Sequence, residues 1–177
     1  WSRKEILEKI PPLFGGGEMI QDVFEETSTW AELPHKFEAG TPAIAEAIGL
    51  AEAINYINNI GLNEIHEYEK TITKYLFEKL NQIENIEIIG PSPEIDPDRA
   101  SLATFYIKNI HSNDIAEILD SKGICIRSGH HCCQPLHRYI GIKSTARISM
   151  NFTTNKEEID MFIEKLKDTI DFLKINS

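Results

Sequence analysis

Long apolar runs are missing from this sequence. No segment approaches the roughly 20 consecutive apolar residues that a membrane-spanning helix requires. The first residues, Trp1-Ser2-Arg3-Lys4-Glu5, also lack the apolar run of a secretory signal. We therefore expect a cytoplasmic protein.

Positive charge is scarce as well. The chain has 18 Lys and Arg residues against 28 Asp and Glu residues, which gives a formal net charge of −10 at pH 7. General binders of nucleic acid or of anionic membranes need a basic face for phosphate contact, so the composition argues against both classes. An anionic ligand must instead be held by a few local groups.

Cysteine is rare and odd in number. Of the three cysteines, Cys132 and Cys133 are neighbours. Their Cα atoms lie about 3.8 Å apart across a trans peptide, which is closer than the roughly 4.4 to 6.8 Å usual for a disulfide. A bridge between them would be strained, so we interpret all three as free thiols rather than as a disulfide framework.

What is present is typical of a globular α/β protein. The 177 residues, 41% hydrophobic and 26% charged, suffice for one domain or for one domain and part of another. Thr41-Pro42 favours the start of a helix with a wide apolar stripe that ends at a Gly61 cap. A more charged, amphipathic helix follows, so we expect a domain boundary there, with residues 1–61 in one domain and 62–177 in another.

The second half alternates between the two hydrophobic periods, 2.0 for strands and 3.6 for helices. We expect a small sheet covered on one face by the helix after Gly61 and by the last helix, which begins at a Thr154–Glu157 capping box. The expected strands lie at 86–89, 101–107, 124–127 and 146–152, a short helix lies at 112–120, and another lies before Pro11.

One loop concentrates chemically reactive side chains. It runs from Arg127 to Leu136 as RSGHHCCQPL and follows a predicted strand. A thiol attacks as the thiolate, which forms more readily beside cations, and this loop supplies Arg127, His130 and His131 close to Cys132. We therefore interpret Cys132 as a nucleophile. Cys125, inside a predicted strand, is interpreted as a packing residue.

A metal site is the alternative use of the same loop. Zinc ligands usually stand two to four residues apart so that each can point at one centre. Four consecutive candidates, from His130 to Cys133, fit that pattern badly, and only His131, Cys133 and His137 are suitably spaced. We expect no metal here.

Three further residues are candidates with weaker patterns. Thr41, after Gly40 at a helix start, suits an anion such as phosphate, although a capped helix with nothing bound is the commoner outcome. Arg147 lies on the polar side of an alternating strand, where it can hold a carboxylate or simply form an exposed ion pair. Lys36 lacks the surroundings of a reactive lysine and is interpreted as structural.

Taken together, four stretches resemble one family. The sequence is similar to SufS-like (group II) cysteine desulfurases, a group of class V aminotransferase relatives that use pyridoxal phosphate, and the similarity extends over essentially the whole chain. The matching stretches are Gly15–Ile20, Leu33–Pro42, Arg127–Cys132 with Gln134–Leu136, and Thr145–Arg147 with Asn155.

The resemblance implies an α/β, fold type I pyridoxal-phosphate enzyme that forms a homodimer. Residues 1–61 would be the tail of the large cofactor domain and 62–177 the small C-terminal α/β sandwich domain. Such an enzyme converts L-cysteine to L-alanine and passes the sulfur to an acceptor protein of iron–sulfur cluster assembly.

The resemblance also implies a role for each candidate. Cys132 would carry the persulfide, Arg147 would hold the substrate carboxylate, and Arg127 would line the pocket. Thr41, with Gly40, would reach the cofactor phosphate in the partner subunit's site. His130 or His131 would assist proton transfer, and the Gly15–Gly17 loop would lie at the dimer interface.

Two features depart from the family pattern. Cys133 stands where the family usually has a small, unreactive residue. The lysine that binds the cofactor is expected in a segment before Trp1, so we expect these 177 residues alone to be inactive. Two other functions remain open from the residues: selenocysteine lyase, and a non-catalytic interaction module.

Overall fold

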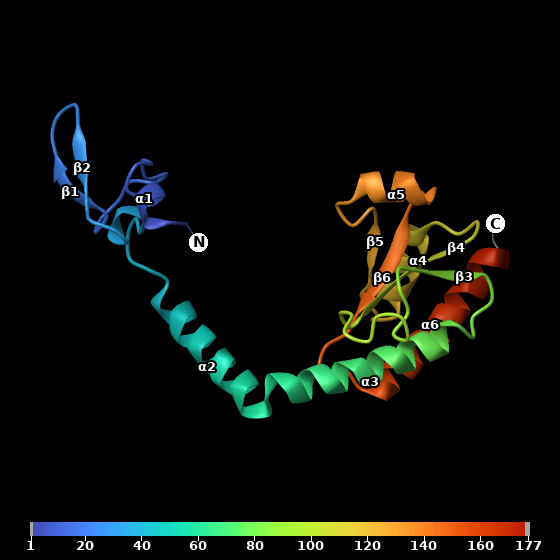
Figure 1. Ribbon diagram of the computed structural model, residues 1–177. Coiled ribbons are helices and arrows are strands. Elements are labelled where there is room, and N and C mark those ends of the chain that lie inside the picture. Colours follow the sequence, from blue (N-terminus) through green and yellow to red (C-terminus); the bar gives the residue numbers. More distant parts are fainter. Residues whose placement is uncertain (1, 176–177) are drawn as a thin grey trace. The chain divides into compact units, whose positions relative to one another are not determined.

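The computed structural model describes residues 2–175, and the chain forms two compact units (Figure 1). The first unit ends at Asn59 and the second begins at Ile60. Each unit is described by itself below. Among the helices of residues 2–175, none is both long enough and apolar enough to cross a membrane.

The first unit is small and has little interior. Met19 and Lys36 are the buried residues of its described part. The Lys36 ammonium donates hydrogen bonds to the carbonyl oxygens of Leu7 (3.2 Å) and Glu8 (3.1 Å), at the end of the first helix, which fits a structural role for this lysine. The elements are α1 (Lys4–Leu7), the antiparallel pair β1 (Ile20–Val23) and β2 (Ser28–Trp30), the 3-10 helix η1 (His35–Phe37) and α2 (Ile44–Ile60).

Helix α2 differs from its prediction in two ways. It begins at Ile44 and not at Thr41-Pro42, because the Ile44 amide bonds to the Pro42 carbonyl (2.8 Å) in a turn before the helix. The Gly40 amide is held by the Gly17 carbonyl (2.9 Å), and the chain bends at Gly40 and Thr41 before the helix begins. The predicted apolar stripe is present, but none of the helix's 17 residues is buried.

The second unit is built on a four-stranded antiparallel sheet of order β3-β4-β6-β5 (Figure 1). Helix α6 packs on α3 and α4, and α3 and α4 pack on the sheet. The elements are α3 (Leu62–Leu80), β3 (Ile86–Ile89), β4 (Leu102–Ile107), α4 (Ser112–Ser121), β5 (Arg127–Gly129), α5 (Gln134–Ile140), β6 (Thr145–Ser149) and α6 (Lys156–Ile175).

Alternation along the strands separates two faces of this sheet. Ala103, Phe105 and Ala146 point into the core with the apolar sides of α3, α4 and α6. Their neighbours Thr104 and Arg147, which pair across β4 and β6, therefore point to the opposite face. The predicted cover of α3 and α6 is present, and α4 joins it through Ile115 and Leu119.

The expected strand at 124–127 is wrong. The strand β5 begins only at Arg127, because the Ile124 amide still bonds to the Leu119 carbonyl (2.9 Å) and continues the turn after α4. Cys125 is consequently exposed, and its thiol donates to an Asp120 carboxylate oxygen at 3.6 Å. Our interpretation of Cys125 as a packed strand residue is wrong for the same reason.

The start of the last helix is shifted by one residue from its prediction. The reciprocal capping bonds join Asn155 and Glu158: the Asn155 amide donates to the Glu158 carboxylate (3.0 Å), and the Glu158 amide donates to the Asn155 side-chain oxygen (2.8 Å). Thr154 instead accepts a bond from the Asn151 amide (3.3 Å) in the preceding turn. The strand before this turn ends at Ser149 rather than at 152.

Candidate active site

Cys132 lies at the tip of a tight turn between β5 and α5. The Cys133 amide donates to the His130 carbonyl (2.8 Å), which closes a four-residue turn. Both central residues are left-handed, with φ of 50° at His131 and 60° at Cys132, the conformation of a type I′ turn. Left-handed backbone is costly for a residue with a side chain, and such strain concentrates at functional sites. The turn leaves the Cys132 thiol exposed.

Arg127 contacts this thiol directly. Its Nη2 atom donates to Cys132 Sγ at 3.1 Å. A guanidinium in that position stabilises negative charge on sulfur. The prediction that Arg127 lies close to Cys132 is thus met by the geometry of the turn, which folds the thiol back toward the start of β5.

The sheet register places a second arginine beside the first. Arg127 on β5 is paired directly with Arg147 on β6. Directly paired residues of antiparallel strands share a face, and this face is the one opposite the core. Like charges in such a pair are destabilising unless a counter-charge joins them, so the pair favours an anionic ligand on the open face of the sheet.

Polar atoms near this pair are buried without partners. The Nε atom of Arg147 and both ring nitrogens of His131 are shielded from solvent, and none of them makes a hydrogen bond of standard geometry to the described residues. Burial lowers the pKa of His131 from its ordinary 6.5, and the nearby charge of Arg147 lowers it further. At neutral pH this imidazole is therefore an uncharged group that can accept a proton.

His137 is a part of the site that the sequence reasoning treated only as a poor metal candidate. Its buried ring joins the loop to β6, since Nδ1 donates to the Cys133 carbonyl (3.1 Å) and Nε2 contacts the Thr145 hydroxyl (3.0 Å). Its position four residues after Cys133, one helical turn away, is the signal that could have found it. His130, by contrast, is exposed and lies edge-on to the His137 ring.

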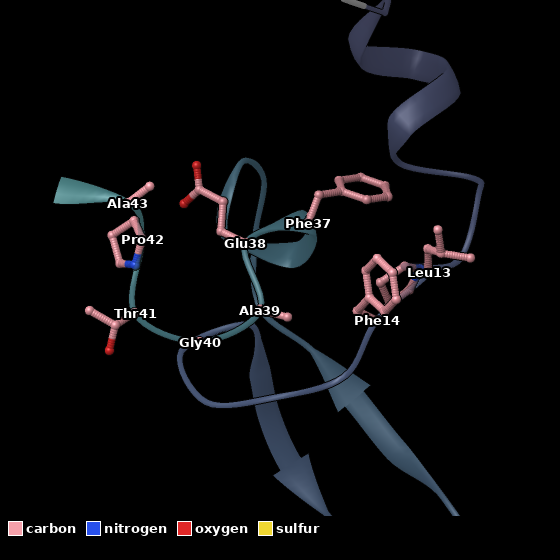
Figure 2. Close-up of a pocket in the computed structure, with 10 residues that line it drawn as sticks. Leu13, Phe14, Phe37, Glu38, Ala39, Gly40, Thr41, Pro42 and Ala43 are labelled. Atoms are coloured by element: carbon pink, nitrogen blue, oxygen red, sulfur yellow. The ribbon is translucent and has the colours of Figure 1, made fainter. Parts of the chain in front are cut away.

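Thr41 and Gly40 form a separate feature within the first unit. Figure 2 shows the Gly40–Ala43 segment on one side of a hollow and Leu13 and Phe14 on the other. The hollow has a volume of about 440 Å³. Gly40 has φ of 82° with open space where a side chain would be, and Thr41 is exposed.

The carboxylate of Glu38 belongs to the same hollow and is paired with His35 Nδ1 at 2.9 Å. Across residues 2–175, no three His, Cys, Asp or Glu side chains gather closely enough to hold a metal ion. In the second unit, the Cys132 thiol contacts Arg127, which pairs with Arg147 across the sheet.

These features define an α/β protein that presents a thiol and two guanidinium groups on the open face of an antiparallel sheet. The chain belongs to the aminotransferase class-V family, whose sequence model matches residues 1–162. The prediction of an α/β, fold type I chain is confirmed by solved structures of pyridoxal-phosphate enzymes.

Two relatives with similar sequences are both named probable cysteine desulfurases. The chain is 51% identical over 172 residues to a probable cysteine desulfurase of Synechocystis, covering 97% of this chain and 41% of that protein. It is 46% identical, with the same coverage, to a probable cysteine desulfurase of Staphylococcus epidermidis. The chain therefore spans about two fifths of the length of these relatives.

Solved structures are similar to this chain over nearly its whole length. A cysteine desulfurase from Thermococcus onnurineus, solved in its apo form, has a TM-score of 0.81 and 35% identity, covering 97% of this chain and 42% of that one. The cysteine desulfurase CsdA (S-sulfonic acid) from Escherichia coli has a TM-score of 0.81 and 26% identity, with the same coverage.

Proposed function

We propose that this chain is the C-terminal part of a SufS-like cysteine desulfurase, which converts L-cysteine to L-alanine and holds the sulfur as a persulfide on Cys132. The observation that carries the proposal is the exposed Cys132 thiol, on a strained turn, within 3.1 Å of the Arg127 guanidinium. The names of the relatives at 46% and 51% identity support it.

Three side chains of the second unit have tasks in this reaction. Arg147 binds the substrate carboxylate, since its buried Nε lacks a partner and a guanidinium holds a carboxylate bidentately. Arg127 stabilises the Cys132 thiolate that attacks the substrate sulfur. His131, whose uncharged ring has two buried nitrogens without a hydrogen bond of standard geometry, is the proton acceptor that we favour over the exposed His130.

The residues fit pyridoxal 5′-phosphate as the cofactor. The buried Arg147 Nε atom without a partner fits an anionic group on this face of the sheet, and the open Gly40-Thr41 turn can receive a phosphate. When bound, the cofactor supplies an electron sink for bonds at the substrate α-carbon. We propose that Thr41 and Gly40 hold the phosphate in the partner subunit's site of a homodimer.

The activity belongs to a chain longer than these 177 residues, since the relatives are more than twice as long. We expect the 177 residues alone to be inactive. In the complete enzyme the persulfide would pass to a sulfur-acceptor protein of iron–sulfur cluster assembly in the cytoplasm. Selenocysteine lyase activity and a purely interacting module are the alternatives that the experiment must separate.

The decisive measurement is alanine and persulfide formation from L-cysteine by the complete enzyme and its Cys132→Ala variant. We expect the variant to lose at least about 10³-fold in kcat, the scale for removal of a nucleophile. Cys125→Ala, which removes another exposed thiol, is the matched control and should stay within about twofold. Undiminished persulfide formation in Cys132→Ala would refute the role of Cys132.

The same variant separates the alternatives. Selenocysteine turnover that exceeds cysteine turnover in the wild type and survives in Cys132→Ala would indicate a selenocysteine lyase. A complete protein that forms alanine from neither substrate would indicate an interaction module.

A further inference from the structure

The proposed reaction gives Cys133 no task, although Cys133, like Cys132, is an exposed free cysteine. Cys133 is exposed, and its thiol makes no hydrogen bond within residues 2–175. Its backbone, however, is held on both sides: the amide bonds to His130 O (2.8 Å) and the carbonyl accepts from His137 Nδ1 (3.1 Å). A free thiol on a fixed backbone is thus presented beside the nucleophile.

We propose that Cys133 is a second sulfur carrier, which takes the outer sulfur of the persulfide from Cys132. This inference rests on the proposed function, which supplies the persulfide. The Cys133 thiolate attacks the outer sulfur, a Cys133 Sγ–S bond forms, the Cys132 Sγ–S bond breaks, and Cys132 leaves as a thiolate. The Cys133 proton goes to solvent when its thiolate forms, so that the negative charge ends on Cys132. No oxidant or reductant is needed, because one persulfide and one thiol are exchanged for another such pair.

Geometry favours this transfer over closure of a disulfide between the two residues. The peptide between Cys132 and Cys133 is trans, since the cis bond of the described chain is Leu33-Pro34. A disulfide needs its two sulfurs about 2.05 Å apart and strains when the Cα atoms are only about 3.8 Å apart. Attack on the outer sulfur of a persulfide keeps that sulfur between the two Sγ atoms, so the transfer does not need the direct Sγ–Sγ bond that strains the backbone.

The surroundings give the transfer a direction. When the sulfur leaves Cys132, negative charge returns to an atom that accepts a hydrogen bond from Arg127 at 3.1 Å. Cys133 has no such donor in the described structure. Because a guanidinium stabilises a thiolate, the state with the sulfur on Cys133 and the charge on Cys132 is favoured. The result is a persulfide one residue further along the chain from Arg127, on an exposed cysteine that an acceptor can reach.

The test locates the sulfur after a single turnover. The complete enzyme is given one equivalent of L-cysteine, alkylated, digested and analysed by tandem mass spectrometry, in which cleavage between residues 132 and 133 separates the two masses. We expect severalfold more outer sulfur on Cys133 than on Cys132 in the wild type, and none on either residue in Cys132→Ser. In Cys133→Ser the sulfur should remain on Cys132. Cys125→Ser, the matched control, should leave the distribution unchanged.

Failure of this proposal differs visibly from failure of the proposed function. Alanine formation with all outer sulfur on Cys132 would overturn the transfer and leave the desulfurase assignment intact. Outer sulfur found on Cys133 in the Cys132→Ser variant would also overturn the transfer, because Cys133 would then take sulfur directly from the substrate. Formation of a disulfide between Cys132 and Cys133, with release of sulfide, would overturn the transfer as well.

If the complete enzyme forms no alanine, the proposed function is refuted. A second measurement then tests sulfur transfer from Cys132 to Cys133 without the enzymatic reaction. The 177-residue chain is loaded with substoichiometric sodium tetrasulfide and left to equilibrate before alkylation. We expect the outer sulfur to favour Cys133 severalfold in the wild type and to spread evenly in Arg127→Gln. An even distribution in the wild type would overturn the proposal.

Discussion

Cys132 is exposed and adopts a backbone conformation that suits glycine better than cysteine. Its φ of 60° lies in the left-handed region, which raises the free energy of a residue with a Cβ atom by roughly 1–2 kcal/mol. This strain is present only in the folded chain, and the exposed side chain adds little stabilising packing. The conformation that presents the thiol therefore lowers the stability of the fold.

We expect Cys132→Gly to be more stable than Cys132→Ala by about 1 kcal/mol, because glycine relieves the left-handed strain. Urea unfolding of the two variants of the 177-residue chain measures the difference. The same pair of substitutions at Cys133, where φ is −133°, is the matched control and should give the opposite order. Equal stabilities of the two Cys132 variants would show that the turn is not strained.

His131 connects the arginine pair to the pH dependence of the site. Burial and Arg147 both lower its pKa from 6.5, so the unfolded chain binds this proton more readily than the folded chain. Stability contributed by the uncharged ring is present above pH 6.5 and is lost as the pH falls below that value.

We expect Arg147→Gln to raise the pKa of His131, because it removes the second-largest cause of the shift. NMR titration of the His131 ring protons in the wild type and the variant measures the change directly. Arg138→Gln is the control, since Arg138 bonds to Gln134 and is not among the causes of the shift. A His131 pKa that does not respond to loss of Arg147 would contradict the arrangement on the open face.

Some of the site residues could be read from the sequence and others could not. The loop from Arg127 to Leu136 was identifiable because reactive residue types crowd into ten positions. The Arg127–Arg147 pair depends on strand register over some twenty residues of chain, which local pattern does not determine. The role of His137 also depends on tertiary contact, with Thr145 on β6.

At the scale of elements, types were predictable and boundaries were less so. The strong alternation of β4 and β6 and the helical periods of α3 and α6 identify these elements. The start of α6 was misplaced by one residue, because Thr154 and Asn155 are both good capping residues with a Glu three positions later. Ile124-Cys125-Ile126 suggested a strand from its β-branched residues, but bonding to α4 holds it outside the sheet.

The capping box of α6 gives the prediction that belongs to this scale. Asn155→Ala should destabilise the chain by about 1 kcal/mol, because the Glu158 amide loses its acceptor at the helix start. Thermal unfolding followed by circular dichroism measures the loss. Thr154→Ala, at the position predicted from sequence, is the comparison and should cost less. A larger effect at Thr154 than at Asn155 would reverse our assignment of the cap.

For the molecule as a whole, the two units differ sharply in how much apolar surface they bury. The core cluster of the described structure lies entirely in the second unit, between Ile72 and Ile170. In the first unit Met19 is the buried apolar residue, while α2 exposes Ile44, Ile48 and Ile54. The apolar stripe of α2 therefore predicted a helix correctly but not its burial, since burial depends on a surface that covers it.

Burial of apolar surface is the main source of folding stability. Because the second unit buries most of the apolar surface, we expect it to supply most of the free energy of unfolding. We expect residues 60–177 alone to unfold cooperatively with a midpoint within about 2 °C of that of the whole 177-residue chain. Calorimetry on both chains measures this. Leu166→Ala, in the centre of the core, should cost both chains the same amount, about 2–5 kcal/mol. A midpoint that falls by more than about 5 °C on removal of residues 1–59 would mean that the first unit stabilises the second. Equal midpoints would mean that the loop bearing Cys132 folds independently of residues 1–59.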